Sequence, residues 1–284
     1  MKILDGIKVR DFIAEKIKKE LKKLKVKPKL VIIQIGNDER SAVYVRQKKI
    51  FGEKLGFEVE YIQLDKNIEQ KDIISKIEIL NNDKFVNGII VQLPIPRKLN
   101  QSEIMEKINP LKDVDGMNYK NLGSILGGDM THIIPATTRG ILSLLDFYKI
   151  KIEGKKVLIL GRSLLVGRPT ALAFLNRDAT VTICHSKTKN IKDEIKRADI
   201  IISAIGIPNF IKKTFVRKGQ IVIDVGISKI GDKIVGDADF KQISKIVSFI
   251  TPVPGGIGPM TVVSLFENLL LVYKKQIDMV KYNS

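Results

Sequence analysis

The chain has 284 residues, which is long enough for one large domain or two smaller domains with a hydrophobic core, and its formal net charge is +18. No apolar run reaches the roughly 18 residues that a membrane span requires, and the start lacks the apolar region of a signal peptide. The single cysteine, Cys184, excludes an internal disulfide, so we expect a cytoplasmic protein without a membrane partner.

Three interpretations of the net charge remain open. A basic surface is typical of proteins that bind nucleic acid. Most lysines, however, stand beside glutamates in stretches such as "AEKIKKELKKLK" and "KDEIKR", which indicates a solvated helical surface, and no basic stripe is interleaved with aromatic residues. We therefore expect no nucleic-acid partner. A positive field that attracts an anionic substrate or cofactor is the third possibility.

The first half of the chain alternates helical and extended patterns. Residues 8–24 place apolar side chains at helical spacing, and "KLVIIQIG" (29–36) is a continuous apolar run like a buried parallel strand. A helix over 41–55, the strand "EVEYIQL" (58–64), a helix over 69–81 and the strand "GIIVQLP" (88–94) follow. This alternation predicts an α/β domain with a mostly parallel sheet.

A second α/β series begins after about Asn121. A helix is predicted over 138–149, and helices over 168–177 and 190–197 separate the first three of four short β-rich runs: "KKVLILG", "ATVTICHS", "ADIIISAIG" and "QIVIDVGIS". A last helix is predicted over 262–280. We predict two α/β domains: residues 1–120 joined by the C-terminal helix 262–284, and a Rossmann-like domain over 121–261.

The stretch "VLILGRSLLVGRPT" (157–170) resembles a strand that enters a phosphate-binding turn, although its glycines differ from G-x-G-x-x-G. Gly161 permits a sharp turn, Ser163 and Val166 replace the second and third glycines, and Gly167 comes one position late. Pro169 suits a helix start, whose free N–H groups would favour phosphate. Arg162 and Arg168 add charge, but an ordinary strand–helix turn remains an alternative.

The next strand bears on the choice of dinucleotide. NAD-binding folds carry an acid about 20 residues beyond the glycine turn, where it accepts from the ribose 2′-hydroxyl. Here the end of "TVTICHSKT" carries His185, Ser186, Lys187 and Thr188, and Asp178 stands at the wrong end of the strand. Hydroxyls and cations suit a 2′-phosphate, so we expect NADP, with Arg162 and Ser186 holding that phosphate. We interpret His185 as a positioned polar residue rather than a catalyst.

A lysine falls on an apolar stripe of the predicted helix 41–55. Tyr44, Lys48, Phe51 and Leu55 recur at spacings of four, three and four, whereas the charged residues Arg46, Lys49 and Glu53 fall on another stripe. Desolvation would lower the pKa of Lys48 and suit it to acid–base chemistry. A lysine that snorkels from the edge of a packed face is the alternative.

Polar residues also follow two other predicted strands. Gln92 precedes the two prolines of "VQLPIP", and Asp113 and Asp115 flank the glycine turn of "KDVDGMN". Ligands of open α/β sheets gather beyond the carboxyl ends of strands. Each segment alone could equally be turn chemistry.

Together these segments resemble the bifunctional methylenetetrahydrofolate dehydrogenase/cyclohydrolase family. The matching motifs occur in family order over nearly the whole chain: "YVRQK" (44–48), "VQLPIP" (91–96), "KDVDG" (112–116), "GRSLLVGRP" (161–169), "TVTICHSKT" (180–188), "VIDVGI" (222–227) and "PVPGGIGPMT" (252–261). The resemblance implies oxidation of 5,10-methylenetetrahydrofolate with NADP, then hydrolysis to 10-formyltetrahydrofolate, in the one-carbon metabolism that feeds purine biosynthesis. It also implies two α/β domains with a folate cleft between them and a homodimer.

The resemblance assigns roles to individual residues. Lys48 would be the catalytic lysine, Gln92 would hydrogen-bond and tune it, and Asp115 would bind the pterin. Substrate contacts are expected from Tyr44 and from the loop residues Pro254, Gly255 and Gly256. The expected cofactor-binding residues are Gly161, Arg162, Ser163, Val166, Gly167, Ser186 and Ile227. No metal is expected, and tetrahydrofolate derivatives, with polyglutamylated forms among them, would be the partners.

The sequence departs from the family pattern in two places. A second lysine commonly follows the catalytic one by two positions, where this chain has Ile50, and the pattern PCTPxG reads "PATTRG" over 135–140. These departures bear on the balance of the two activities. Two alternatives to the bifunctional enzyme also stay open: a family member that retains only the dehydrogenase and prefers NAD, and a basic α/β nucleic-acid binder built on a dinucleotide fold, against which the intact Lys48, Gln92 and Asp115 argue.

Overall fold

The computed structural model describes residues 2–282, without the side chains of Glu39, Arg40 and 280–282. The chain divides into two compact units. The six-stranded unit comprises residues 2–12, 125–130 and 137–263, and the three-stranded unit comprises 13–124, 131–136 and the chain from Ser264 onward. Helices α1 (Gly6–Leu21) and α10 (Ile257–Tyr282) each contribute residues to both units.

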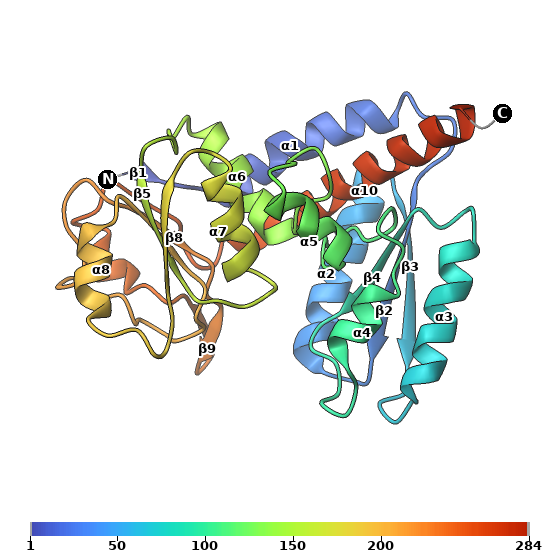
Figure 1. Ribbon diagram of the computed structural model, residues 1–284, viewed down its shortest axis with the longest axis horizontal. Coiled ribbons are helices and arrows are strands. Elements are labelled where there is room, and N and C mark those ends of the chain that lie inside the picture. Colours follow the sequence, from blue (N-terminus) through green and yellow to red (C-terminus); the bar gives the residue numbers. More distant parts are fainter. Residues whose placement is uncertain (1, 283–284) are drawn as a thin grey trace. The chain divides into compact units, whose positions relative to one another are not determined.

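The three-stranded unit is built on a parallel sheet of order β3-β2-β4 (Figure 1). Its elements, besides parts of α1 and α10, are β2 (Lys29–Ile35), α2 (Glu39–Leu55), β3 (Glu58–Leu64), α3 (Gln70–Asn82), β4 (Gly88–Gln92), α4 (Gln101–Glu106) and most of α5 (Tyr119–Leu126). The predicted strands and helices of this region are confirmed to within a few residues. The short helices α4 and α5 were not predicted, because neither is long enough to show a clear apolar period.

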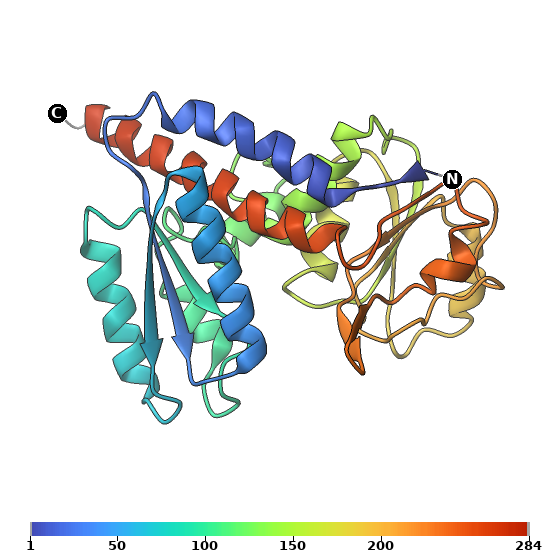
Figure 2. The same ribbon diagram turned by 180° about the vertical axis from the view of Figure 1, so that it is seen from behind.

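Both faces of this sheet are covered, which explains why β2 is apolar without alternation. One face packs Val31, Ile33 and Ile35 against α3 and α4 in a common buried cluster. On the other side α2 approaches α10 so closely that a Cβ on Gly52 would lie 2.5 Å from the ring of Phe266. Figure 2 shows α2 and the C-terminal helix on this side. The sheet therefore presents its carboxyl edge, at Ile35, Leu64 and Gln92, as the open place for polar groups.

The six-stranded unit is a parallel sheet of order β1-β11-β8-β7-β5-β6. From β5 the chain first adds β6 on one side and then adds β7 and β8 on the other side. This is the Rossmann-like order expected from the sequence, with its switch point between β5 and β7. The elements are β1 (Lys2–Ile3), α6 (Ala136–Phe147), β5 (Lys156–Leu160), α7 (Gly167–Leu175), β6 (Thr180–Cys184), α8 (Ile191–Arg197), β7 (Ile200–Ser203), β8 (Ile221–Asp224), β9 (Ser228–Ile230), β10 (Lys233–Val235), α9 (Phe240–Ile243) and β11 (Phe249–Ile250).

The N-terminal segment differs from the predicted division. Residues 2–12 group with the six-stranded unit rather than with the rest of 1–120, because β1 pairs with β11 in register Lys2 to Phe249. Two-residue strands such as these carry too little pattern to be predicted. The last helix begins at Ile257, five positions before the predicted start, since Pro259 is tolerated in a first helical turn.

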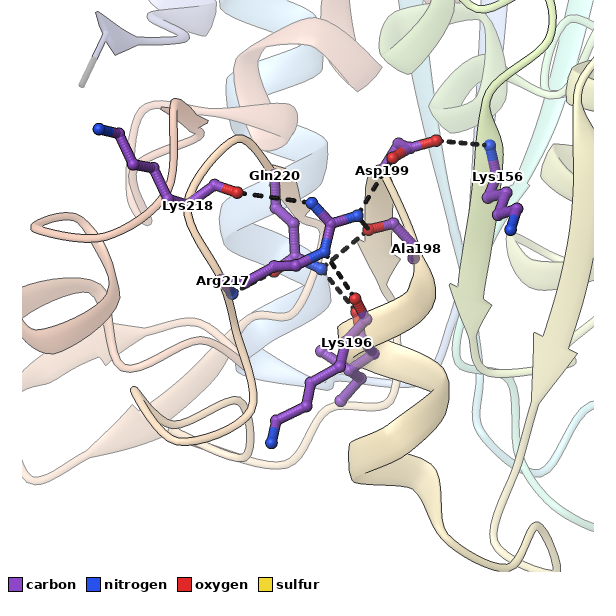
Figure 3. A network of polar contacts seen from close by, with 8 residues as sticks. Lys156, Lys196, Ala198, Asp199, Arg217, Lys218 and Gln220 are labelled. Atoms are coloured by element: carbon purple, nitrogen blue, oxygen red, sulfur yellow. Dashed lines mark hydrogen bonds and ion pairs between the residues drawn. The ribbon is translucent and has the colours of Figure 1, made fainter.

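A polar network ties the amino edge of the six-stranded sheet (Figure 3). The Arg217 guanidinium donates to the carbonyls of Lys196 and Ala198 at the end of α8 and to Asp199 Oδ1 at 3.2 Å. Asp199 accepts from the Lys156 amide at 3.0 Å, so it joins the start of β7 to the start of β5. This hydrogen bond and the Arg217 cation lower the pKa of Asp199 despite its partial burial. The network is structural and lies away from the carboxyl edge.

Candidate active site

Lys48 is a buried amine on α2. Its side chain is 8% exposed, while Arg46, Lys49 and Glu53 on the other stripe are exposed, so the predicted division of this helix is confirmed. Snorkelling is excluded, because a snorkelling lysine keeps its ammonium group in water. Burial lowers the pKa of Lys48 from its ordinary value, and the Asp115 charge opposes part of that shift. The amine is therefore suited to exchange a proton nearer neutrality.

Gln92, at the end of β4, fixes the position of this amine. Lys48 Nζ donates to Gln92 Oε1 at 2.9 Å. Gln92 Nε2 donates in turn to the Leu93 carbonyl at 2.7 Å, which orients the amide with its oxygen toward the lysine. Ser41, in the first turn of α2, donates to the same carbonyl at 3.4 Å. The structure thus brings together the two residues that the sequence paired.

Asp115 lies on a loop that buried hydrogen bonds hold in place. Asp113, which is 1% exposed, accepts from the amides of Gly116 and Asn118 at 2.9 and 2.7 Å and from Asn121 Nδ2 at 3.0 Å. Burial raises the pKa of Asp113 to about 6, although these hydrogen bonds lower it and the Asp115 charge adds to the rise. Asp113 therefore shapes the turn, and half-buried Asp115 is the carboxylate left to act near Lys48.

Asn268 is a supporting residue that the sequence did not reveal. From α10 its Nδ2 donates to the carbonyls of Val114 and Ile134 at 2.8 and 2.9 Å, and it is fully buried. It joins the Asp115 loop to the segment at Ile134, although Asn268 is more than 100 residues from either of them in the chain. The signal in the sequence was an asparagine in the largely apolar run "LFENLLLVY". Tyr44 stands one turn before Lys48, 36% exposed, and burial raises the pKa of its phenol.

In the six-stranded unit, the two glycines of the β5–α7 turn each allow a close backbone approach. Gly161 has φ +112°, and a Cβ on it would lie 2.6 Å from the Ala204 carbonyl oxygen. A Cβ on Gly167 would lie 2.3 Å from the Gly161 carbonyl oxygen. Gly167 therefore packs helix against strand, as the last glycine of a dinucleotide fingerprint does. We had expected Pro169 to be the first residue of this helix. The helix begins at Gly167, so Pro169 is its third residue.

Polar groups surround this turn. Ser163 Oγ accepts from the amides of Val166 and Gly167 at 3.2 and 3.4 Å and so helps to cap α7. Arg162 is exposed, as is Ser186 beyond the end of β6, the neighbour of β5. His185 Nδ1 accepts from the Lys187 amide at 3.2 Å, which fits a positioned polar residue. No carboxylate occurs over 185–188, so the cradle fits a dinucleotide with a 2′-phosphate.

The remaining predicted residues follow β8 and β11 in the same unit. Ile227 is 47% exposed, and a Cβ on Gly258 would lie 3.9 Å from it. Pro254 is exposed, while Gly255 accepts from the Gly6 amide at 2.9 Å. The altered "PATTRG" segment forms the start of α6, where Thr138 and Thr170 share a fully buried hydrogen bond of 2.9 Å. The predicted cofactor residues and Lys48 thus belong to different units.

A chain that combines a Rossmann-type unit with a glycine turn and a second α/β unit with a desolvated amine has the features of a dinucleotide-linked enzyme. The models of the tetrahydrofolate dehydrogenase/cyclohydrolase catalytic domain and NAD(P)-binding domain match residues 4–115 and 135–277. The chain belongs to this family.

Similar proteins extend the match over the whole chain. The bifunctional protein FolD of Acholeplasma laidlawii is 48% identical over 96% of this chain and 99% of its own length, and that of Hydrogenobaculum sp. is 46% identical over 98% and 100%. The crystal structure of the bifunctional FolD enzyme from Campylobacter jejuni superposes with a TM-score of 0.95 at 40% identity, covering 97% and 99% of the two chains. Within residues 2–282, no helix is long and apolar enough for a membrane crossing.

Proposed function

We propose that this chain oxidises 5,10-methylenetetrahydrofolate to the 5,10-methenyl form with NADP⁺ and then hydrolyses that product to 10-formyltetrahydrofolate. The observation that carries the proposal is the buried Lys48 amine, hydrogen-bonded to Gln92 and near the Asp115 charge. The family resemblance of the sequence motifs assigns these residues their roles, and the chain matches both family domains.

The oxidation requires positioning more than proton transfer. Loss of hydride from the methylene bridge leaves a cation shared by two nitrogens and one carbon. NADP⁺, when bound in the six-stranded unit, would supply the hydride acceptor. A permanently charged ammonium nearby would oppose that cation, whereas the lowered pKa of Lys48 reduces this repulsion. Asp115 can accept from the N–H edge of a pterin, and Tyr44 offers an aromatic surface for the aminobenzoate part. Binding and orientation then supply most of the rate.

The hydrolysis requires proton transfer, and Lys48 is the group assigned to it. Water adds to the methenyl carbon, its proton must leave, and the bond from that carbon to one nitrogen breaks while the nitrogen gains a proton. A lysine whose pKa is lowered by burial can take and return a proton at this position. Gln92 keeps the amine in one place through the 2.9 Å hydrogen bond.

The cofactor proposal depends on the turn of the six-stranded unit. Gly161, Ser163, Val166 and Gly167 would bind the pyrophosphate side, with Arg162 and Ser186 at the 2′-phosphate and Ile227 beside the nicotinamide end. The Trypanosoma brucei FolD, 33% identical over 97% of this chain with a TM-score of 0.92, was solved with NADP and an inhibitor. The proposal also includes substrate contacts from Pro254, Gly255 and Gly256, a homodimer and a cytoplasmic location.

The first experiment follows both reactions in one cuvette. Purified protein given methylenetetrahydrofolate and NADP⁺ should produce NADPH and methenyl absorbance, and the methenyl signal should then decay faster than without enzyme. Lys48→Met should lower the enzymatic decay at least about 100-fold, because it removes the acid–base group. Lys49→Met, at the exposed neighbouring position, is the matched control and should retain both activities. Decay at the unmutated rate in Lys48→Met would remove Lys48 from its role.

A second experiment tests the cofactor assignment. Turnover with NADP⁺ should exceed turnover with NAD⁺ at equal concentration, since no carboxylate is available at 185–188 to accept from a free 2′-hydroxyl. Ser186→Asp should reverse the preference by raising the KM for NADP⁺ about tenfold or more, because like charges repel. Equal KM values for NADP⁺ in the two proteins would contradict the placement of the 2′-phosphate.

A further inference from the structure

Two buried aspartates, neither of which has a role assigned above, lie together at the carboxyl edge of the six-stranded sheet. Asp224 ends β8 and is 3% exposed, and Asp237 follows β10 and is fully buried. Burial, and the neighbouring Asp237 charge, raise the pKa of Asp224 to about 7. Buried carboxylates are costly unless hydrogen bonds satisfy them, so their partners indicate what they do.

Asp237 holds the loop that leaves β7. Its Oδ2 accepts from Ser203 Oγ at 2.8 Å and from the Ile205 amide at 2.9 Å, and its Oδ1 accepts from the Ile207 amide at 2.9 Å. The amides of Ile205 and Ile207 therefore point inward to a carboxylate. Loop 204–207 is fixed by a residue 30 or more positions away in the chain.

Asp224 holds the adjoining loop and Asp237 itself. It accepts from the Gly226 amide at 3.0 Å, from the Asp237 amide at 3.0 Å and from the Ala238 amide at 2.8 Å. Each aspartate carboxylate packs against a glycine that lies next to, or two residues after, the other aspartate in the chain. A Cβ on Gly236 would lie 2.0 Å from Asp224 Oδ2, and a Cβ on Gly226 would lie 2.2 Å from Asp237 Oδ1.

The loops held in this way border the switch point of the sheet. β7 and β8 are neighbours, and β7 also pairs with β5. The Ala204 carbonyl lies directly against Gly161 of the β5–α7 turn, and loop 225–227 ends at exposed Ile227. Ser228 Oγ donates to the Gly206 carbonyl at 3.3 Å and joins the two loops. In parallel α/β sheets a dinucleotide lies over this edge.

We propose that Asp237 and Asp224 are positioning residues for the dinucleotide: they fix loops 204–207 and 225–227 in the conformation that receives its ribose–nicotinamide half. The proposal rests on the cofactor placement given under the proposed function. The aspartates act through the backbone and touch no reacting atom. Disturbing them should therefore weaken cofactor use while leaving the cofactor-free hydrolysis intact.

Asp237→Asn is the principal test. The amide keeps the size of the side chain but presents N–H donors where one backbone amide now donates, so one of the loop contacts is lost. The KM for NADP⁺ in the dehydrogenase assay should rise about tenfold, and the dissociation constant of NADP⁺ from the substrate-free enzyme should rise equally. Hydrolysis of added methenyltetrahydrofolate should stay within about twofold of the unmutated enzyme.

Asp199→Asn is the matched control. Asp199 also joins strands of this sheet through backbone and side-chain hydrogen bonds, but at the amino edge (Figure 3). It should lower thermal stability and leave the KM for NADP⁺ unchanged. An equal KM for NADP⁺ in Asp237→Asn and Asp199→Asn, or a parallel loss of both activities in Asp237→Asn, would overturn the proposal.

Two further variants keep the outcome decisive. If Asp237→Asn does not fold, Ser203→Ala removes a single contact and should raise the KM for NADP⁺ about threefold, whereas an unchanged KM would overturn the proposal. Arg162→Ala separates this proposal from the cofactor placement. If it raises the KM for NADP⁺ while Ser203→Ala and Asp237→Asn do not, the placement stands and the aspartates are purely structural.

Discussion

At the scale of single residues, the burial of the Lys48 amine is energetically unfavourable. Among the side chains that the structure describes, Gln92 Oε1 at 2.9 Å is the acceptor for an ammonium group that has three donors. Burial lowers the pKa of the amine, and only the Asp115 charge counteracts this. The fold therefore bears a cost at Lys48 that a protein selected for stability alone would avoid.

Lys48→Met should stabilise the protein while abolishing hydrolysis. Methionine has a similar length and needs no hydrogen bonds, so the free energy of unfolding at pH 7 should rise by about 1 kcal/mol or more. In the unmutated protein the unfolded chain binds the extra proton between the lowered pKa and the ordinary value of 10.5, so stability rises with pH in that window. Urea unfolding at several pH values should show this rise only in the unmutated protein.

Asp115→Asn should shift the pH dependence of hydrolysis. The Asp115 charge favours the protonated form of Lys48, so its removal should move the apparent pKa of the lysine to lower pH. The profile of kcat should shift in that direction even though binding of the pterin is also weakened. Asp72→Asn, on the exposed first turn of α3, is the control. A shift to higher pH in Asp115→Asn would contradict the electrostatic account.

At the scale of elements, the loop over 112–116 is shaped by one glycine. Gly116 has φ +74°, and a Cβ there would lie 2.7 Å from the Pro135 nitrogen. Asp113 and Asn268 hold the backbone around it, so the loop cannot simply move aside. The Asp115 carboxylate depends on this turn for its position.

Gly116→Ala should therefore destabilise the protein by about 1–3 kcal/mol and lower turnover. Gly123→Ala is the matched control in the same unit: it lies within α5 with no atom within 4 Å of the new Cβ, and should stabilise by up to about 1 kcal/mol. Thermal unfolding of the two variants compares them directly. A loss as large in Gly123→Ala as in Gly116→Ala would show that the turn geometry is not the cause.

The sequence predicted those elements whose pattern is long enough to read. These patterns are local: the apolar periods of α1, α2 and α3 and the apolar runs of the longer strands can be recognised from consecutive residues. In the same way, the spacing of Tyr44, Lys48 and Phe51 marked the unusual lysine. The pairing of β1 with β11 and the partners of Asp237 could not be read. These contacts join residues far apart in the chain, and tertiary packing alone selects them.

At the scale of the whole molecule, the net charge of +18 acts as a field rather than as a site. Many lysines have local partners, such as Lys29 with Glu58 and Glu60 at 3.3 and 2.8 Å, but the excess remains. A positive molecule attracts a phosphorylated dinucleotide and a folate with an anionic tail. NADP carries more negative charge than NAD, so the positive field should attract NADP more strongly at long range, in addition to the short-range contacts that bind its 2′-phosphate.

Salt should therefore weaken the use of NADP⁺ more than that of NAD⁺. Between about 0.05 and 0.5 M NaCl the Debye length falls severalfold, and the KM for NADP⁺ should rise about threefold or more. The KM for NAD⁺ should change less, and potassium glutamate in place of NaCl separates ionic strength from chloride binding. Equal salt dependence for the two cofactors would assign the preference to short-range contacts alone.

The crosswise seating of Asp224 against Gly236 and of Asp237 against Gly226 has an evolutionary consequence. Any side chain larger than hydrogen at either glycine would displace the aspartate carboxylate that packs against it. Replacing either aspartate by a smaller residue would leave a cavity and backbone N–H groups without acceptors. These four positions should therefore be inherited as one unit. Lineages that lose one member should have replaced the others as well, together with the loops that they hold.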